Sequence, residues 1–175
     1  MPHQDDHVRR IEEIALFIAR KEGGDAEILR IAARFHDICR DEENHALKSA
    51  EKAREILTEM GYDGDFINKV CHCIESHSFS GNVRPESIEA KILSDADKLD
   101  ALGAVGVARA FLFSGENGGD IESTLKHFEE KLLGLRDLMY TKTAIKIAEE
   151  RYEFMKEFYA RIKMELELRD ISDVS

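Results

Sequence analysis

The stretch Arg34-Phe-His-Asp-Ile-Cys-Arg40 contains an adjacent His36-Asp37 pair, around which we expect the fold to be arranged. An imidazole nitrogen beside a carboxylate oxygen forms a mixed ligand pair that suits Mn, Fe, Co, Ni or Zn. Leu29, Ala33 and His36 recur at helical spacing, so His36 ends an apolar stripe that should face the interior. Buried charge needs a partner, and a metal is one such partner. The other interpretation is a helix-end pair that is exposed or bonded locally.

The composition is typical of a helical protein with a substantial core. The chain has 175 residues, enough for one domain, and 35% of them are charged while only two are prolines. No uninterrupted apolar run reaches about 18 residues, so we expect no membrane span. The net charge of −11 argues against binding of an extended nucleic acid. It does not exclude a small phosphate ester, because a bound metal supplies local positive charge.

The N-terminus and the cysteines indicate a cytoplasmic location. The segment Met1–Asp6 lacks the basic and then apolar pattern of a secretion signal. Three cysteines, an odd number, argue against a disulfide framework. Cys71 and Cys73 flank His72, but on a helix the two thiols would point about 200° apart around the axis and could not bind one ion. We therefore predict packing roles for this tripeptide.

Apolar residues recur at helical spacing along the chain without strand alternation, which predicts an all-α fold. We expect a first helix from Asp6 to Lys21, ended by Gly23-Gly24. Asp25 is then the expected N-cap of a second helix that ends at the His36-Asp37 pair. Pro85 would open a fifth helix. The later helices are expected over about residues 45–60, 66–77, 85–113, 125–139 and 144–166.

Several ionisable residues that lie far apart in the sequence fall at the ends of these apolar stripes or beside them. One histidine on an apolar face is usually a satisfied core residue. Several near helix ends are harder to explain in that way, because each would need its own buried partner. The set is His7, His36, Asp37, His45, His77 and Asp97.

The order His7, then His36-Asp37, then Asp97 resembles the HD-domain superfamily of metal-dependent phosphohydrolases. Three segments extend the resemblance over nearly the whole chain and look like a prokaryotic branch of small stand-alone HD proteins: Asp6–Ile11, Ile74–Gly81 and Ala90–Gly103. The resemblance implies one HD-domain helical bundle over residues 1–175. Its metal-binding core would span about 5–113, with C-terminal helices of about 122–170 packing on it.

The resemblance also implies a ligand set for one divalent ion: His7, His36, Asp37 and Asp97. Asp97 is preferred to Asp95 because the last ligand of the family usually follows an alanine in an Ala-Asp-x-Leu-like segment. Asp100 lies about one helical turn further on and could support the site, or it could be a solvated or capping carboxylate like Asp95. Cys39 departs from the glycine of many relatives, so this turn either does not need a positive φ or tolerates it at a cost.

Two more histidines match branches of the superfamily that bind two metals. His45 and His77 would complete a second site bridged by Asp37, or would contact substrate phosphate. This pattern is similar to the branch that hydrolyses symmetrical dinucleoside polyphosphates. The alternative for His45 is a solvent-exposed residue at the start of a helix.

The implied activity is hydrolysis of a phosphate ester or anhydride, of a nucleotide or a related small molecule, by a metal-activated water. Asp37 would be central to catalysis, and candidates to orient the water are Glu42, Glu43 and Asp100. Candidates for the substrate phosphate, each of which could also be a surface or ion-pair residue, are Arg40, Lys98 and Arg109. One alternative is an HD-type di-iron oxygenase, and another is a nucleotide-binding sensor without turnover. The chain could be a monomer or a homodimer.

Overall fold

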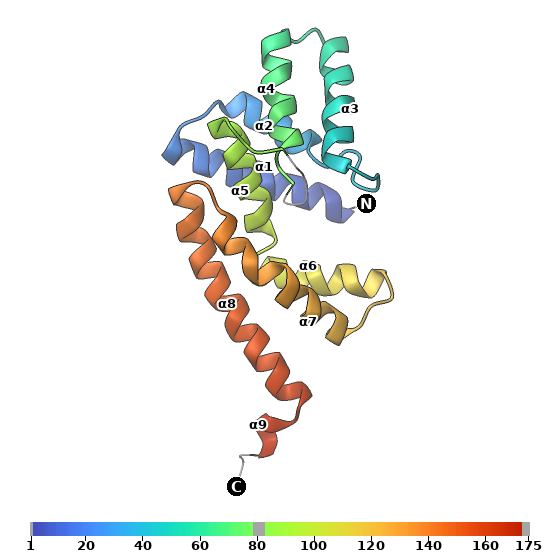
Figure 1. Cartoon of the computed structure of the whole chain (residues 1–175), viewed down its shortest axis with the longest axis vertical. Coiled ribbons are helices and arrows are strands. Elements are labelled where there is room, and N and C mark those ends of the chain that lie inside the picture. Colours follow the sequence, from blue (N-terminus) through green and yellow to red (C-terminus); the bar gives the residue numbers. More distant parts are fainter. Residues whose placement is uncertain (1, 79–82, 173–175) are drawn as a thin grey trace. The chain divides into compact units, whose positions relative to one another are not determined.

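The computed structural model describes residues 2–78 and 83–172, and all regular structure within them is helical. This confirms the predicted all-α class. In chain order the elements are α1 (Pro2–Glu22), α2 (Ala26–Phe35), α3 (His45–Glu59), α4 (Gly64–Glu75), α5 (Ile88–Asp100), α6 (Gly103–Glu116), α7 (Ile121–Glu130), the 3-10 helix η1 (Leu132–Leu138), α8 (Lys142–Leu166) and α9 (Arg169–Ser172) (Figure 1).

Two compact units divide the chain. The first comprises residues 1–98 and 139–144, and the second comprises residues 99–138 and 145–175. The boundaries therefore fall inside α5, at the end of η1 and inside α8. The predicted arrangement of a core over about 5–113 with helices of about 122–170 packed on it stays a prediction.

The first unit is held together by the apolar faces of its helices. In α1, His7, Ile11, Ala15 and Ile18 follow one another at intervals of four, four and three residues, and all four are buried. α2 packs against both α1 and α4, and α3 runs beside α4 as an adjacent pair (Figure 1). Each buried leucine or isoleucine contributes about 1.5–3 kcal/mol. This stripe carries His7 into the interior, as its spacing predicted.

The predicted start of α2 is confirmed. An Asp25 carboxylate oxygen accepts hydrogen bonds from the backbone N–H groups of Glu27, at 2.8 Å, and of Ile28, at 3.3 Å. These two bonds satisfy donors that a helix N-terminus leaves without intrahelical partners. The backbone N–H of Asp25 donates in turn to a Glu89 carboxylate oxygen at 2.9 Å, which ties the start of α2 to α5.

Two predicted boundaries around α5 are wrong. The helix begins at Ile88 rather than at Pro85, because the Ser87 hydroxyl accepts from the backbone N–H of Ala90 at 3.0 Å and acts as the cap. The helix also does not continue to Phe113: it ends at Asp100, and α6 starts at Gly103, whose φ of +73° is incompatible with a continuous α-helix.

Two further predicted helices are shorter than expected. The fourth helix, predicted to reach His77, ends at Glu75, so His77 lies just beyond α4. The predicted 125–139 helix divides into α7 and η1, with the break at Lys131. Apolar spacing alone did not show either end, because the apolar residues continue past it.

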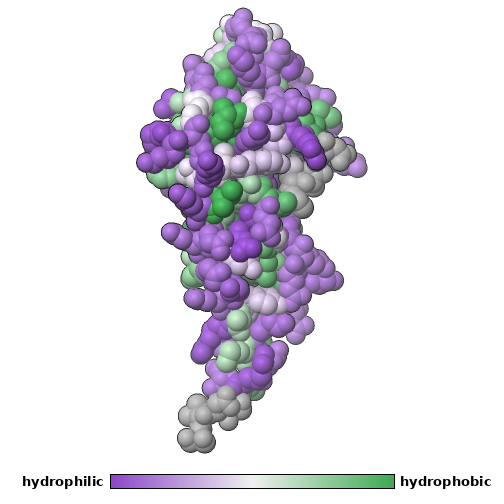
Figure 2. All heavy atoms as spheres, turned by 60° about the vertical axis from the view of Figure 1, so that its left-hand side comes forward, coloured by the Kyte–Doolittle hydropathy of each residue, from purple (hydrophilic) through white to green (hydrophobic). Residues whose placement is uncertain are grey.

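Hydrophilic residues cover most of the face drawn in Figure 2, in keeping with the net charge of −11. Among the described residues, none of the helices combines the length and the apolar character that crossing a membrane requires.

Asp95, in α5, holds the start of α8 within the first unit. This fully buried carboxylate accepts hydrogen bonds from the backbone N–H of Tyr140 at 2.9 Å, and from the backbone N–H and the hydroxyl of Thr141, both at 2.8 Å. The sequence offered only a solvated or capping role for Asp95. Its position explains why segment 139–144 belongs to the first unit.

Replacing Asp95 by alanine leaves these three donors without their acceptor. We expect Asp95→Ala to lower the free energy of unfolding by about 3 kcal/mol, because buried donors then lose their bonds to a charged group. Urea unfolding followed by circular dichroism measures this change. Glu13→Ala, at an exposed position of α1, is the control and should unfold like the wild type. Equal midpoints for both variants would contradict the anchoring role.

Candidate metal centre

The His36-Asp37 pair lies where α2 ends. His36 is the C-cap residue, and its Nδ1 donates to the carbonyl oxygen of Ala33 at 2.8 Å. This bond fixes the ring and leaves Nε2 as the atom that faces the carboxylate of Asp37. His36 is completely buried and Asp37 is 8% exposed. The predicted inward orientation of the pair is present in the structure.

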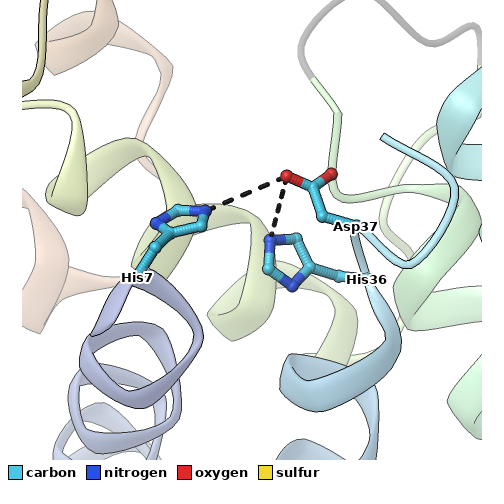
Figure 3. Close-up of side chains that lie close together, drawn as sticks. All are labelled: His7, His36 and Asp37. Carbon is cyan, nitrogen blue, oxygen red and sulfur yellow. Dashed lines mark ion pairs between the residues drawn. The ribbon is translucent and has the colours of Figure 1, made fainter. Parts of the chain in front are cut away.

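Four histidine rings surround the Asp37 carboxylate, two near each oxygen. Oδ2 lies 3.6 Å from Nε2 of His36 and 3.9 Å from Nε2 of His7 (Figure 3). Oδ1 lies 3.6 Å from Nε2 of His77 and 3.8 Å from Nε2 of His45. These separations are too long for strong hydrogen bonds. They suit ligand atoms that each lie about 2.1 Å from a shared ion.

The ligand atoms fall into two groups that could each hold a metal ion. The first group is His7, His36 and Asp37, and the second is Asp37, His45 and His77. Within each group the ligand atoms lie within 4.8 Å of one another. Asp37 belongs to both, so one carboxylate could serve two ions. The sequence placed these five residues on four separate segments, with His36 and Asp37 adjacent, and the fold brings them together.

The chemistry of His36 fits a metal. Its Nε2 is buried and has no hydrogen-bond partner among the described residues. A buried polar atom without a partner costs about 1–3 kcal/mol. Burial, together with the nearby His77, lowers the pKa of His36 to about 4 and keeps the imidazole neutral. A neutral nitrogen with a free electron pair directed at a carboxylate is what a divalent cation requires.

The remaining members of the site are ionised or oriented by their neighbours. Burial opposes ionisation of Asp37, but His77, His36 and Arg40 outweigh it and hold the pKa of the carboxyl below its usual value. Burial lowers the pKa of His77, but the carboxylates of Asp37 and Asp97 reverse this and raise it. Nδ1 of His77 lies 2.6 Å from the carbonyl oxygen of Ile74, which directs Nε2 towards Asp37.

Helix α5 brings Asp97 to the same place. Its Oδ1 lies 3.7 Å from Nε2 of His7, and its side chain is 31% exposed. One turn earlier, the Ser94 hydroxyl donates to the carbonyl oxygen of His77 at 3.1 Å. The Lys98 ammonium donates to the Ser94 hydroxyl at 2.5 Å and to the Ser94 carbonyl oxygen at 3.1 Å. α5 therefore supports His77 as well as carrying Asp97.

Arg40 and the two acidic candidates after it lie on the exposed turn that follows Asp37. Nη1 of Arg40 lies 3.2 Å from Oδ2 of Asp37, and the Arg40 side chain is 44% exposed. Glu42 is exposed and pairs with Lys48 at 3.2 Å, and Glu43 is exposed as well. These positions leave Arg40 and both glutamates accessible to a ligand.

Two other predicted residues belong to the second unit. Asp100 is buried there, and the guanidinium of Arg109 donates to its carboxylate and, at 3.3 Å, to its carbonyl oxygen. Arg151 lies near this pair and donates to the carbonyl oxygen of Leu99 at 2.5 Å. The structure thus gives Asp100 and Arg109 a mutual ion pair.

Sequence reasoning missed the residues that support the site. Ser49, fully buried in α3, accepts from the backbone N–H of Cys39 at 3.1 Å and steadies the turn after Asp37. Ser94 instead donates to the carbonyl oxygen of His77 and so supports that residue. Each serine lies on a helical face with a predicted ligand, four residues after His45 and three before Asp97, and that spacing was the available indication. Positive φ among the described non-glycine residues occurs at Asn44 and Leu168, so the Cys39 turn does not require it.

The tripeptide with two cysteines packs as predicted. Cys71 and Cys73 are both buried, and the thiol of Cys71 donates to the carbonyl oxygen of Ala50 at 3.4 Å. Burial raises the pKa of Cys73 to about 12, which keeps this thiol protonated and inert. Nε2 of His72 accepts from the backbone N–H of Glu86 at 3.1 Å.

The structure is an all-α domain in which several helix ends converge on one shared carboxylate, and the histidines around it form groups that could hold a divalent metal. Residues 5–102 match the HD domain, and the chain belongs to this family. HD domains bind divalent metals, and the histidine and aspartate groups described above could hold one.

Related proteins agree with this assignment. The chain is 38% identical over 173 residues to the uncharacterized protein YpgQ of Bacillus subtilis (strain 168), covering 94% of this chain and 84% of that protein. A crystal structure of YpgQ matches with a TM-score of 0.78 and 39% identity, over 91% of this chain and 86% of that one. A second YpgQ structure, in complex with ADP, matches with a TM-score of 0.74 and 35% identity, over 91% of this chain and 87% of that one. The crystal structure of an HD-superfamily hydrolase from Bacillus thuringiensis matches with a TM-score of 0.72 and 34% identity, over 92% of this chain and 85% of that one.

We expect a metal ion to stabilise the fold through Nε2 of His36. Mn²⁺ at about 100 times its dissociation constant should raise the melting temperature of the wild type by roughly 5–10 °C. His36→Asn keeps a donor for the Ala33 carbonyl but removes Nε2, so this rise should be clearly smaller while the variant remains helical. Differential scanning fluorimetry measures the shift. The control is His127→Asn, at an exposed position of α7, which should retain it. A full shift in His36→Asn would exclude His36 as a ligand.

Proposed function

We propose that this protein is a metal-dependent phosphohydrolase that acts on a phosphate ester or anhydride of a nucleotide or related small molecule. The observation that carries the proposal is the buried Asp37 carboxylate between two groups of histidines. Membership of the HD family and the likeness to an HD-superfamily hydrolase support hydrolysis. The complex of YpgQ with ADP supports a nucleotide, and such a substrate agrees with the cytoplasmic location that we predict.

In this proposal the first ion is held by His7, His36, Asp37 and Asp97, and Asp37 also serves the second group with His45 and His77. The mixed nitrogen and oxygen donors suit Fe, Mn, Co, Ni or Zn. When bound, such an ion lowers the pKa of a coordinated water and offsets negative charge on the phosphoryl oxygens. If only one ion binds, His45 and His77 contact the substrate phosphate instead.

The residues of the chain then position the substrate. Arg40 presents an exposed, planar guanidinium beside Asp37, and this group can bind two phosphate oxygens at once. Lys98 adds positive charge next to Asp97. Arg109 is a weaker candidate for phosphate because its guanidinium bonds the buried Asp100.

A carboxylate is needed to orient the attacking water, and the three candidates differ in their surroundings. Glu42 and Glu43 follow Asp37 on the exposed turn, and Glu42 shares its charge with Lys48. Asp100 is buried and paired with Arg109, which leaves it poorly suited to accept a proton. We therefore propose Glu42 or Glu43 for this role.

The shared Asp37 also fits a dinuclear oxygenase, which is the second candidate function. Two metal groups with a common carboxylate are the arrangement that a di-iron site requires. Oxygen consumption coupled to turnover would favour the oxygenase, whereas turnover under anaerobic conditions favours hydrolysis. Tight nucleotide binding without either reaction would favour a sensor.

We expect Asp37→Asn to reduce phosphate release from the best nucleotide in a broad screen with Mn²⁺, Co²⁺ or Ni²⁺ by about 1,000-fold or more. The reason is that loss of the carboxylate removes metal-assisted stabilisation of several kcal/mol. Asp41→Asn, on the exposed part of the same turn, is the matched control and should keep its rate. Unchanged turnover in Asp37→Asn would refute the mechanism.

Metal content separates one ion from two. We expect elemental analysis of protein purified without chelator to give about two ions per chain, because two groups share Asp37. His77→Ala should then reduce the content to about one, since it removes a ligand of the second group only. A content of about one ion in the wild type, unchanged in His77→Ala, would return His45 and His77 to contact with phosphate.

A further inference from the structure

We propose that Tyr140 stacks on the planar ring of the substrate and so selects a nucleotide over a ribose phosphate. The inference rests on the proposed function and specifies the substrate class of the same site. Two features of the first unit carry it. The backbone of Tyr140 is fixed to the helix that carries Asp97. The residue is 49% exposed, and its ring lies beside the ammonium of Lys98.

The backbone of this segment is held at two points. Asp95 accepts from the N–H groups of both Tyr140 and Thr141. Glu22, at the end of α1, accepts from the backbone N–H and the hydroxyl of Thr143 at 2.7 and 2.6 Å. Tyr140 therefore stands on a fixed backbone although it lies outside any helix. Such a ring loses little conformational freedom when it stacks on a ligand.

A chain of contacts connects this ring to the metal centre. Asp97, which approaches His7, is followed in α5 by Lys98, whose ammonium lies 5.1 Å from the centre of the Tyr140 ring. Lys98 is itself buried, and the carboxylates of Asp95 and Asp97 lie near its ammonium. The positive charge is thus close to both the Asp97 carboxylate and the aromatic face.

This combination matches the two chemical parts of a nucleotide. The Lys98 ammonium has three N–H donors. Among the described residues, the hydroxyl and the carbonyl oxygen of Ser94 accept two of them. In this proposal the third donor binds a phosphate oxygen, although only 6% of Lys98 is exposed. The adjacent aromatic face can stack on a base, because every nucleobase has a planar π surface. A ribose phosphate offers the phosphate but no such surface.

Two other partly exposed aromatic residues of the first unit, Phe17 and Tyr62, lack this connection. Phe17 lies ten residues after His7 in α1, which places it about 15 Å further along the helix axis. Tyr62 is already stacked on Phe66, with ring centres 5.1 Å apart. Tyr140 is distinguished from both by the contact of its ring with Lys98, which follows the candidate ligand Asp97 in the chain.

The natural chain has no tryptophan, so Tyr140→Trp introduces a single fluorophore at this position. With Mn²⁺ present, ADP should quench the fluorescence of this variant and ribose 5-phosphate should not. Tyr62→Trp is the control and should respond to neither compound. Quenching of Tyr140→Trp by both compounds, or by neither, would overturn the stacking contact.

Equilibrium binding provides an independent measurement. By isothermal titration calorimetry, Tyr140→Ala should bind ADP about tenfold more weakly than the wild type, with ribose 5-phosphate affinity unchanged, and Tyr140→Phe should bind ADP normally. Circular dichroism checks that all variants are folded. If Tyr140→Ala does not fold, Tyr140→Phe remains as a variant that keeps the aromatic ring.

The two proposals fail in different ways. Equal ADP affinity for the wild type and Tyr140→Ala, or weak binding by Tyr140→Phe, overturns the stacking role and leaves the hydrolase proposal in place. A wild type that binds no ADP also overturns it. Phosphate release from a non-nucleotide ester, lost in Asp37→Asn, would still support the hydrolase.

Discussion

Asp37 imposes the constraint on which the first unit depends. An ionised carboxylate removed from water is stable only among compensating groups. Here α1, α2 and α3, together with the residue pair that follows α4, each supply a histidine within 4 Å of its oxygens. The apolar faces of these helices bring the rings to one point. The same helix ends therefore serve both packing and the proposed metal binding.

The site also shows where the fold gives up stability for function. Nε2 of His36 is buried without a hydrogen-bond partner among the described residues, although apolar side chains line the same stripe. A leucine or isoleucine there would avoid that cost. A ligand atom that is costly in the free protein becomes favourable when a cation binds, because the cation replaces the missing partner.

Helix α5 joins the site to the rest of the first unit. Successive residues of a helix point about 100° apart, so neighbouring side chains serve different partners. Asp95 holds the backbone at Tyr140 and Thr141, and Asp97 approaches His7. Lys98 donates a hydrogen bond to Ser94, whose hydroxyl donates to the carbonyl oxygen of His77. A single stretch of five residues thus connects the candidate metal ligands to the segment that presents Tyr140, which is why we place substrate recognition there.

The sequence by itself determined the all-α class, the inward position of His7 and His36, and the cap at Asp25, because helical periodicity and capping are local properties. Its His and Asp pattern also indicated the family. Only the tertiary structure decided that four histidines flank the two oxygens of Asp37, that Asp95 is a buried anchor and that Asp100 pairs with Arg109. It also placed the break at Gly103 that the apolar pattern did not show. The physical reason is that hydrogen bonds and ion pairs between residues far apart in the sequence depend on how helices pack. The periodicity of one helix shows which face is buried but not which helix packs against it.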